Sequence, residues 1–267
     1  MGGVMRTAVA EIDNAAIPSC GIAVMAKASI AGRTKTRLVP PLTFEEAAQC
    51  NTAFLRDITD NILAAAAEVS IAGYIAYGPA HARPFFQETL PREIALIEAC
   101  HPTLGECLDH TIAQLLERGH RSAVVLNSDS PTLPTSLLVE TAHVLARPGD
   151  RAVFGPALDG GYYLLGLKAK HHRLFQNIAW STERVAQQTL ERAAELKLPV
   201  HILPTWYDVD DVAGLKMLRA ELFESQSFAP DLCPAQPRHT RGLIQSLIDA
   251  SDLEERLAFK PLRGAAE

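Results

Sequence analysis

The residues best suited to chemistry lie in a short basic segment near the start of the chain. Residues 21–44 contain four basic residues and no acidic one, although the 267-residue chain has a formal net charge of -6. Lys35 and Arg37 are two positions apart, so in an extended loop their side chains leave on one side, and Lys27 and Arg33 can converge from the ends. Arginine offers phosphate a planar fork and lysine a point charge. The segment predicts a site for a small polyanion, with a solvated basic loop as the alternative.

Two carboxylates far apart in the sequence could hold a metal ion beside such an anion. Asp129 follows an apolar stretch and is flanked by serines, and Asp210 lies in the densest acidic cluster of the chain, residues 208–211. Magnesium is bound through one or two carboxylates together with substrate phosphate oxygens. We therefore expect Asp129 and Asp210 to bind Mg²⁺ or Mn²⁺. Helix capping or turn formation is the alternative for Asp129, and Asp211 is well placed to cap a helix that begins at Val212.

Glycines mark two further candidate positions. Asp159, Gly160, Gly161 and Tyr162 follow one another, and paired glycines let a ligand approach the backbone closely. The same four residues are also typical of a tight hairpin turn, so both interpretations stay open. Gly32, within the basic segment, is weak support for a phosphate cradle, and the chain has neither GxxxxGK[ST] nor GxGxxG.

The elements that position these residues follow from the hydrophobic pattern. An apolar run at residues 20–26 predicts a buried strand that leads directly into the basic segment. Thr43 and Glu46 form the pattern of a capping box, which predicts a helix to about Glu68, and a β-rich run at residues 71–77 completes a βαβ unit.

Further strands and helices alternate along the rest of the chain. Alternation of this kind indicates an open α/β sheet with helices on both faces, in which ligands bind at the carboxyl ends of the strands. The basic segment and Asp129 both follow predicted strands, so we expect them at one edge of the sheet. We expect strands at 94–98, 123–126, 152–154, 162–167 and 200–203, and helices at 84–89, 104–118, 134–146, 181–197, 212–223 and 242–257.

Composition limits the class of protein and its partners. The hydrophobic share of 48% is sufficient for a substantial core, and the acidic balance argues against broad nucleic-acid binding. The five cysteines show no CxxC pair, which favours a reducing, cytoplasmic location, and no apolar stretch is long enough to span a membrane. We expect a loose N-terminal arm at residues 1–19, one α/β domain at 20–224, and a C-terminal extension with a terminal helix at 225–267.

Taken together, five segments resemble one known family. Residues 27–38, 127–131, 155–166, 180–182 and 208–210 are similar, in order, to GT-A-like transferases named radical-SAM/selenodomain-associated transferases, some of which are called arsenosugar-biosynthesis glycosyltransferases. The resemblance implies a nucleotide-diphospho-sugar transferase fold, a three-layer α/β/α sandwich with a mostly parallel mixed sheet. The same superfamily includes phospholactate and molybdenum-cofactor guanylyltransferases. In it, Asp129 falls at the first metal-binding aspartate, and Asp210 falls where several nucleotidyltransferases have the second.

These residues lead to one main functional hypothesis and two alternatives. The main one is a Mg²⁺-dependent nucleotidyltransferase that joins a nucleoside triphosphate to a small phosphorylated or phosphonate acceptor and releases pyrophosphate. Lys35, Arg37 and Asp129 would be catalytic, Lys27, Gly32 and Arg33 would bind nucleotide, and residues 159–162 would contact the acceptor. The second hypothesis is a glycosyltransferase that uses a nucleotide-diphospho sugar, and the third is a non-catalytic nucleotide-binding protein. A homodimer is left open.

Overall fold

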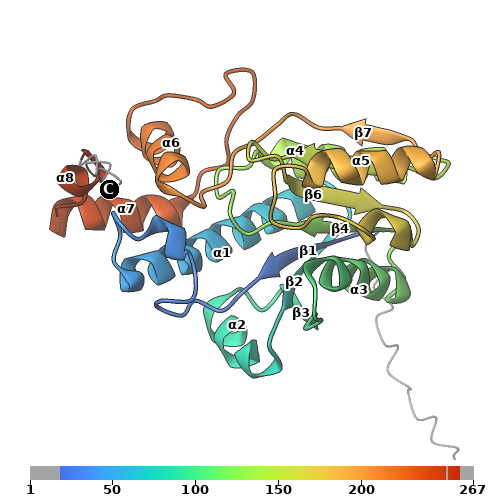
Figure 1. Ribbon diagram of the computed structural model, residues 1–267, viewed down its shortest axis with the longest axis horizontal. Coiled ribbons are helices and arrows are strands. Elements are labelled where there is room, and N and C mark those ends of the chain that lie inside the picture. The colour runs from blue at the N-terminus through green and yellow to red at the C-terminus, as the bar shows by residue number, and fades with distance from the viewer. Residues whose placement is uncertain (1–18, 251, 259–267) are drawn as a thin grey trace, which may run out of the picture.

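A seven-stranded sheet runs through the middle of the molecule, with helices on both of its faces (Figure 1). This computed structural model describes residues 19–250 and 252–258, so the predicted arm at 1–19 lies outside the described residues except for Ser19. The strand order is β3-β2-β1-β4-β6-β5-β7. The strands are β1 Cys20–Ala26, β2 Ile71–Tyr77, β3 Ala95–Glu98, β4 Ser122–Leu126, β5 Ala152–Pro156, β6 Tyr162–Leu167 and β7 Val200–Ile202.

The sheet is mixed because of one strand. Among the described strands, β6 alone runs antiparallel to its neighbours, β4 and β5, and the other neighbouring pairs are parallel. The antiparallel pairing of β5 with β6 makes the segment between them a hairpin connection, as the glycines predicted. The expected mostly parallel mixed sheet is therefore confirmed.

Two of the helices begin at a capping box. Thr43 accepts a hydrogen bond from the Glu46 amide at 3.1 Å, and Glu46 accepts one from the Thr43 amide at 2.8 Å, so the predicted capping box is present. Thr103 and Glu106 form a second one. The helices are α1 Phe44–Ala66, α2 Arg83–Thr89, α3 Leu104–Glu117, α4 Thr135–Ala146, α5 Val185–Glu195, α6 Val212–Phe223, α7 Arg238–Ala250 and α8 Leu253–Ala258, with 3-10 turns η1 Thr36–Leu38, η2 Ala80–Ala82 and η3 His172–Phe175.

Two predicted helix boundaries were wrong. The helix expected from residue 181 begins at Val185, because Ser181 has a left-handed backbone with φ 63° and cannot continue a right-handed helix. The helix expected at 242–257 is two helices, α7 and α8, and the first begins earlier, at Arg238. The carboxylate of Asp57, on α1, accepts the amides of His239 and Thr240 at 2.9 and 2.7 Å, so a distant side chain fixes that start.

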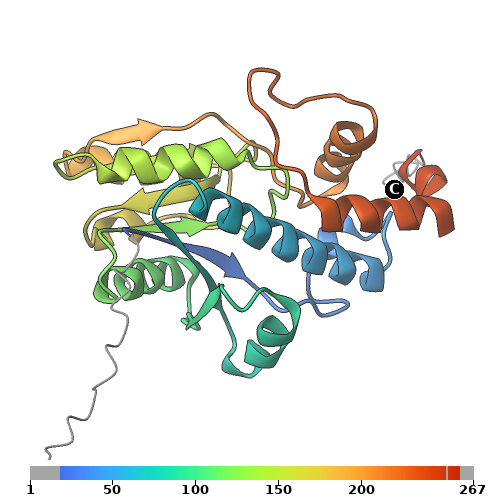
Figure 2. The ribbon, with the colours of Figure 1, turned by 180° about the vertical axis from the view of Figure 1, so that it is seen from behind.

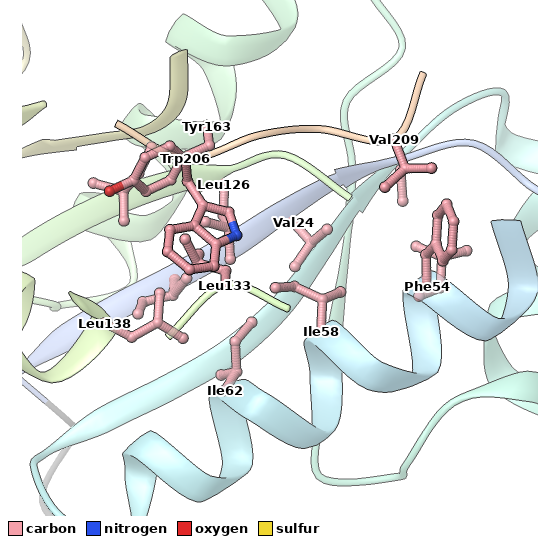
Figure 3. Packing of buried hydrophobic residues seen from close by; sticks show 14 of the residues in the cluster. Val24, Phe54, Ile58, Ile62, Leu126, Leu133, Leu138, Tyr163, Trp206 and Val209 are labelled. Atoms are coloured by element: carbon pink, nitrogen blue, oxygen red, sulfur yellow. The ribbon is translucent and has the colours of Figure 1, made fainter. Parts of the chain in front are cut away.

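Two layers of buried side chains hold the helices to the sheet. The larger layer lies under α1 and α4, and it extends to Ile244 of α7 and to Leu253 and Leu257 of α8. Figure 2 shows α1 and α4 across this face of the sheet, and Figure 3 shows its centre, where Ile58 and Ile62 of α1 face the strands and Trp206. The second layer lies under α3 and α5 on the opposite face.

The functional end of the sheet is the one to which β1 points. In Figure 1 the arrowhead of β1 is directed toward the end of the molecule at which α6 and α7 lie. The basic segment leaves β1 there, and residues 127–131 leave β4, the neighbour of β1. Within the described residues, no helix is both long and apolar enough to cross a bilayer.

Candidate functional site

The basic segment is fixed to the fold by its uncharged residues. The hydroxyl of Thr34, which is buried, accepts the Ile30 amide at 2.8 Å and donates to the Ile30 carbonyl at 2.9 Å. Asn51, on α1, donates to the carbonyl of Lys27 at 3.1 Å and to the hydroxyl of Ser29 at 2.9 Å. The segment is therefore a held loop, which makes the position of each charged side chain in it specific.

Lys35 is the basic residue that turns inward. Its backbone is left-handed, with φ 53°, and its side chain is only 5% exposed. The ammonium nitrogen lies 2.7 Å from Oδ1 of Asp129 and 2.8 Å from Oδ1 of Asp210, and it donates to the Val209 carbonyl at 3.0 Å. The Val209 amide in turn donates to the Asp129 carbonyl at 2.8 Å, so the two acidic segments are joined directly. Two carboxylates predicted from separate segments thus converge on one cation.

Burial and the neighbouring charges together set the pKa values of Lys35, Asp129 and Asp210. Burial opposes a charged Lys35, but Asp129 and Asp210 outweigh it and raise the pKa of the ammonium above its ordinary value. Burial acts against ionisation of Asp210 as well, yet Lys35 and then Arg37 hold the pKa of this carboxyl below its usual range. Burial raises the pKa of Asp129 despite its contact with Lys35. Arg37, which is 71% exposed, pairs with Oδ2 of Asp210 from the solvent side.

The donor set fits a small divalent cation. Oxygen atoms of Asp129 and Asp210 already converge on a single positively charged point, and hard carboxylate oxygens are what Mg²⁺ and Mn²⁺ prefer. Among the described residues there is no group of three or more His, Cys, Asp or Glu side chains that could hold a metal. A metal held by these two carboxylates would therefore need further ligands from substrate phosphate or water. The Lys35 ammonium contacts one oxygen of each of these carboxylates, so it would compete with such an ion for them.

A hollow of about 250 Å³ adjoins the cluster on the side of the basic segment. Lys27, Arg33 and Arg37 line it together with Lys35, and Lys27 and Arg33 form no ion pair within the described part of the chain. Gly32 has φ 74° and lies outside this lining, with open space around its Cα. The structure thus brings the four basic side chains to one hollow but gives Gly32 only a role in the turn.

A larger cavity of about 680 Å³ adjoins the cluster on its other side. Asp159, Gly161 and Tyr162 line it, as do Asp129 and Asp210. Asp159 Oδ1 also accepts the Gly161 amide at 2.8 Å, as expected of a turn residue.

Gly160 is required for a structural reason. It has φ 88°, and a Cβ atom there would lie 2.2 Å from the Glu183 carbonyl oxygen. Gly160 therefore fits the turn interpretation, whereas Gly161 lines the cavity and fits the interpretation as a ligand contact.

Sequence reasoning missed several residues that line this cavity. Asp208 was recognised only as part of an acidic cluster, and Trp180 only as part of a segment that resembles the family. Burial, followed by the neighbouring Asp159 and Asp210, raises the pKa of Asp208 to about 6. Asn127, two residues before Asp129, could have been found from its place at the same strand end. Glu183 gave no signal in the sequence. Asp211 caps α6 as expected, because its Oδ1 accepts the Gly214 amide at 2.9 Å.

Comparison with known proteins supports this fold. The profile of a family described as "Uncharacterized protein conserved in bacteria" (DUF2064) matches residues 61–182, which is less than half of the chain. No functionally curated protein matches the sequence.

Two solved structures can be compared over most of their length. One, from Desulfovibrio desulfuricans G20, is described as a "putative nucleotide-diphospho-sugar transferase"; it is 25% identical, covers 90% of this chain and 98% of its own, and has a TM-score of 0.74. A cytidylyltransferase from Leptospira borgpetersenii is 9% identical, covers 92% and 99%, and has a TM-score of 0.51, so its likeness concerns the fold. The proteins that this chain resembles are transferases, and its α/β sheet with helices on both faces is the fold of a nucleotide-diphospho-sugar transferase.

Proposed function

We propose that this protein is a Mg²⁺-dependent nucleotidyltransferase. The observation that supports the proposal most is the convergence of Lys35, Asp129 and Asp210 at the carboxyl ends of the strands, beside a hollow lined by further basic side chains. Open α/β sheets bind nucleotides at this edge. Because a nucleoside triphosphate brings three phosphates to the site, a hollow with several cations is better matched to it than to a singly charged ligand.

The balance of charge supports a triphosphate together with a metal ion. Four basic side chains line the hollow with two carboxylates, Asp129 and Asp210, so the basic groups are in excess by two. A divalent cation would double this excess. A nucleoside triphosphate carries more negative charge than a nucleotide-diphospho sugar. It is therefore the better match for the larger positive charge of the metal-bound site.

The reaction we propose is an in-line displacement at phosphorus. An oxygen of the acceptor attacks the α-phosphorus and, where it belongs to a hydroxyl group, gives its proton to solvent. The bond from the α-phosphorus to the oxygen that bridges it to the β-phosphorus breaks, and pyrophosphate leaves with that electron pair. Lys27, Arg33 and Arg37 bind phosphate oxygens, and Lys35 offsets charge on the leaving group. A Mg²⁺ or Mn²⁺ ion held by Asp129 and Asp210 would add charge neutralisation. Such catalysis consists mainly of positioning and electrostatic stabilisation, which suits a site that has no obvious nucleophile.

Glycosyl transfer from a nucleotide-diphospho sugar is the second candidate. It is favoured by the description of the Desulfovibrio protein and by Lys35 itself, whose ammonium already neutralises Asp129 and Asp210 without a metal ion. A third candidate is nucleotide binding without turnover. The association with radical-SAM and selenodomain proteins, the cytoplasmic location and a homodimer stay predictions from the sequence.

One experiment separates the three candidates. The protein is incubated with Mg²⁺, each nucleoside triphosphate in turn and a panel of alcohols, amines and phosphate esters, while pyrophosphate is measured. The same panel is repeated with nucleotide-diphospho sugars, with and without EDTA. Pyrophosphate release that requires Mg²⁺ and is lost in Asp129→Asn supports nucleotidyl transfer. Consumption of a nucleotide sugar without pyrophosphate release would replace it with glycosyl transfer, and calorimetric binding with no turnover would leave the third candidate.

A further inference from the structure

The larger cavity adjoins the phosphate hollow at the charged cluster. The two spaces share Met25, Arg37, Asp129 and Asp210 as a common wall, whereas Lys27, Arg33 and Lys35 line only the hollow. A nucleotide whose phosphates occupy the hollow would therefore present its reacting phosphorus to the cavity. The cavity is large enough for a second small molecule, since ligand sites in proteins are typically about 300–1,000 Å³.

The lining of this cavity is acidic. Asp159, Glu183 and Asp208 add three carboxyl groups to those of the shared wall, and Arg37, already paired with Asp210, is the basic residue among the lining. The cavity thus has a negative potential that repels phosphate and carboxylate groups and attracts cations and hydrogen-bond donors.

The rest of the lining is apolar, with two polar atoms that lack partners. Leu104, Leu108 and Trp180 supply apolar surface. The hydroxyl of Tyr162 and Oδ1 of Asn127 are buried at the cavity and have no hydrogen-bond partner among the described residues. Buried polar atoms are nearly always hydrogen-bonded, so an ordered water or a bound molecule is the natural partner for each. Oδ1 of Asn127 can only accept, which requires a donor on that molecule.

We propose that this cavity is the acceptor site and that its acceptor has an apolar body bearing hydroxyl or ammonium groups, and no phosphate or carboxylate. The inference rests on the proposed function, because it takes the hollow as the site of the nucleotide phosphates. It replaces the phosphorylated or phosphonate acceptor that the sequence suggested. The basic residues Lys27, Arg33 and Lys35, which could pair with a phosphate group, line the hollow and not the cavity.

The test uses matched fragments that share one scaffold. Benzyl alcohol, benzylamine and benzyl phosphate, with the corresponding series on cyclohexylmethyl and indolylethyl scaffolds, are screened for binding by saturation-transfer NMR and by quenching of Trp180 fluorescence. The chain has two tryptophans, and Trp206 is fully buried, so Trp180→Phe removes the cavity signal and keeps the core signal. We expect alcohols and amines to bind, and their signals to be lost in Tyr162→Phe combined with Asn127→Ala.

Charge variants make the test specific. Asp159→Asn combined with Glu183→Gln should weaken the amines by roughly tenfold and leave the alcohols nearly unchanged, because it removes two carboxylates from the wall. Asp150→Asn is the matched control, since Asp150 is exposed, pairs with His171 and lies outside the lining. Binding of the phosphate esters at Trp180 in the unmodified protein would overturn the inference, and so would the absence of any fragment signal there.

Failure of this inference can be told apart from failure of the proposed function. Calorimetry with a non-hydrolysable nucleoside triphosphate analogue and Mg²⁺ measures the hollow in the same preparation. If the nucleotide binds and the alcohols and amines do not, the acceptor class is wrong and the proposed function stands. If the fragments bind at Trp180 and no nucleotide binds, the cavity is a site for such molecules, but the assignment of an acceptor falls together with the nucleotidyltransferase.

Discussion

Replacing Lys35 with methionine isolates the role of its charge. Methionine has a similar length and an apolar stem, so the volume of the side chain is largely kept, while the ammonium, which lies 5.4 Å from the centre of the Phe54 ring, is removed. The substitution leaves Asp129 and Asp210 facing each other without the cation that both contact. We expect two consequences, a loss of stability in the protein without metal and a gain in its affinity for divalent cations.

The size of the stability loss follows from the geometry. At an effective dielectric constant of about 20, each contact of Lys35 with a carboxylate, at 2.7 and 2.8 Å, is worth roughly 6 kcal/mol of attraction, most of which the desolvation of the charges offsets. Removing one partner of a buried ion pair costs about 3–5 kcal/mol. Because the Asp129 and Asp210 side chains are 25% and 28% exposed, we expect the lower end, about 3 kcal/mol at pH 7.

Urea unfolding with and without Mn²⁺, together with Mn²⁺ binding followed by electron paramagnetic resonance, measures both consequences. Lys35→Met in EDTA should be about 3 kcal/mol less stable than the unmodified protein, and Mn²⁺ should restore part of the loss without any nucleotide. The unmodified protein should bind Mn²⁺ weakly until nucleotide is added, because the ammonium competes for the same oxygens.

Lys170→Met is the matched control. It removes a lysine from an ion pair with Glu117 in which both side chains are well exposed, so we expect a loss of no more than about 1 kcal/mol and no change in Mn²⁺ binding. Equal stability of Lys35→Met and the unmodified protein would refute the electrostatic reasoning. Equal Mn²⁺ affinity of the two without nucleotide would show that Lys35 does not occupy the cation position.

Three further predictions concern the surroundings of the site. Asp208→Asn should raise the melting temperature in EDTA above about pH 6 and leave it unchanged near pH 3.8 and below: a pKa raised to about 6 by burial and by Asp159 stabilises the protonated native state, and that stability is lost as the pH rises through 6. A shift confined to low pH would contradict this. Gly160→Ala should cost at least about 2 kcal/mol in urea unfolding, because of its φ of 88° and the contact with Glu183, whereas Gly242→Ala, in open space on α7, should be neutral or stabilising by up to about 1 kcal/mol. Arg256→Ala should cost about 1–2 kcal/mol, since Arg256 ties α8 to Glu46 and to the Pro41 carbonyl beside the basic loop, and the exposed Arg238→Ala should cost less than about 0.5 kcal/mol. Equal losses in the two arginine variants would show that the α8 contact adds nothing.

Local patterns predicted much of the fold correctly. The apolar runs of β1 and β2 and the capping box at Thr43 depend on neighbours in the sequence, and each lies where it was expected. The boundaries that were wrong depend on distant or strained residues. Asp57 determines where α7 begins, and the left-handed backbone of Ser181 delays α5. Neither effect is visible in hydrophobic periodicity.

The sequence alone determined which residues could do chemistry and at which edge of the sheet they would meet. Short-range patterns identify strand ends, and the basic segment, Asp129 and Asp210 all follow from them. Only the tertiary structure decided which charged side chains pair with one another, because these contacts join segments up to 175 residues apart. It turned Lys35 inward onto the two carboxylates, left Lys27 and Arg33 facing the hollow, and gathered Asp159, Glu183 and Asp208 on the other side. The structure thus places a hollow lined by basic side chains next to a cavity lined by acidic ones.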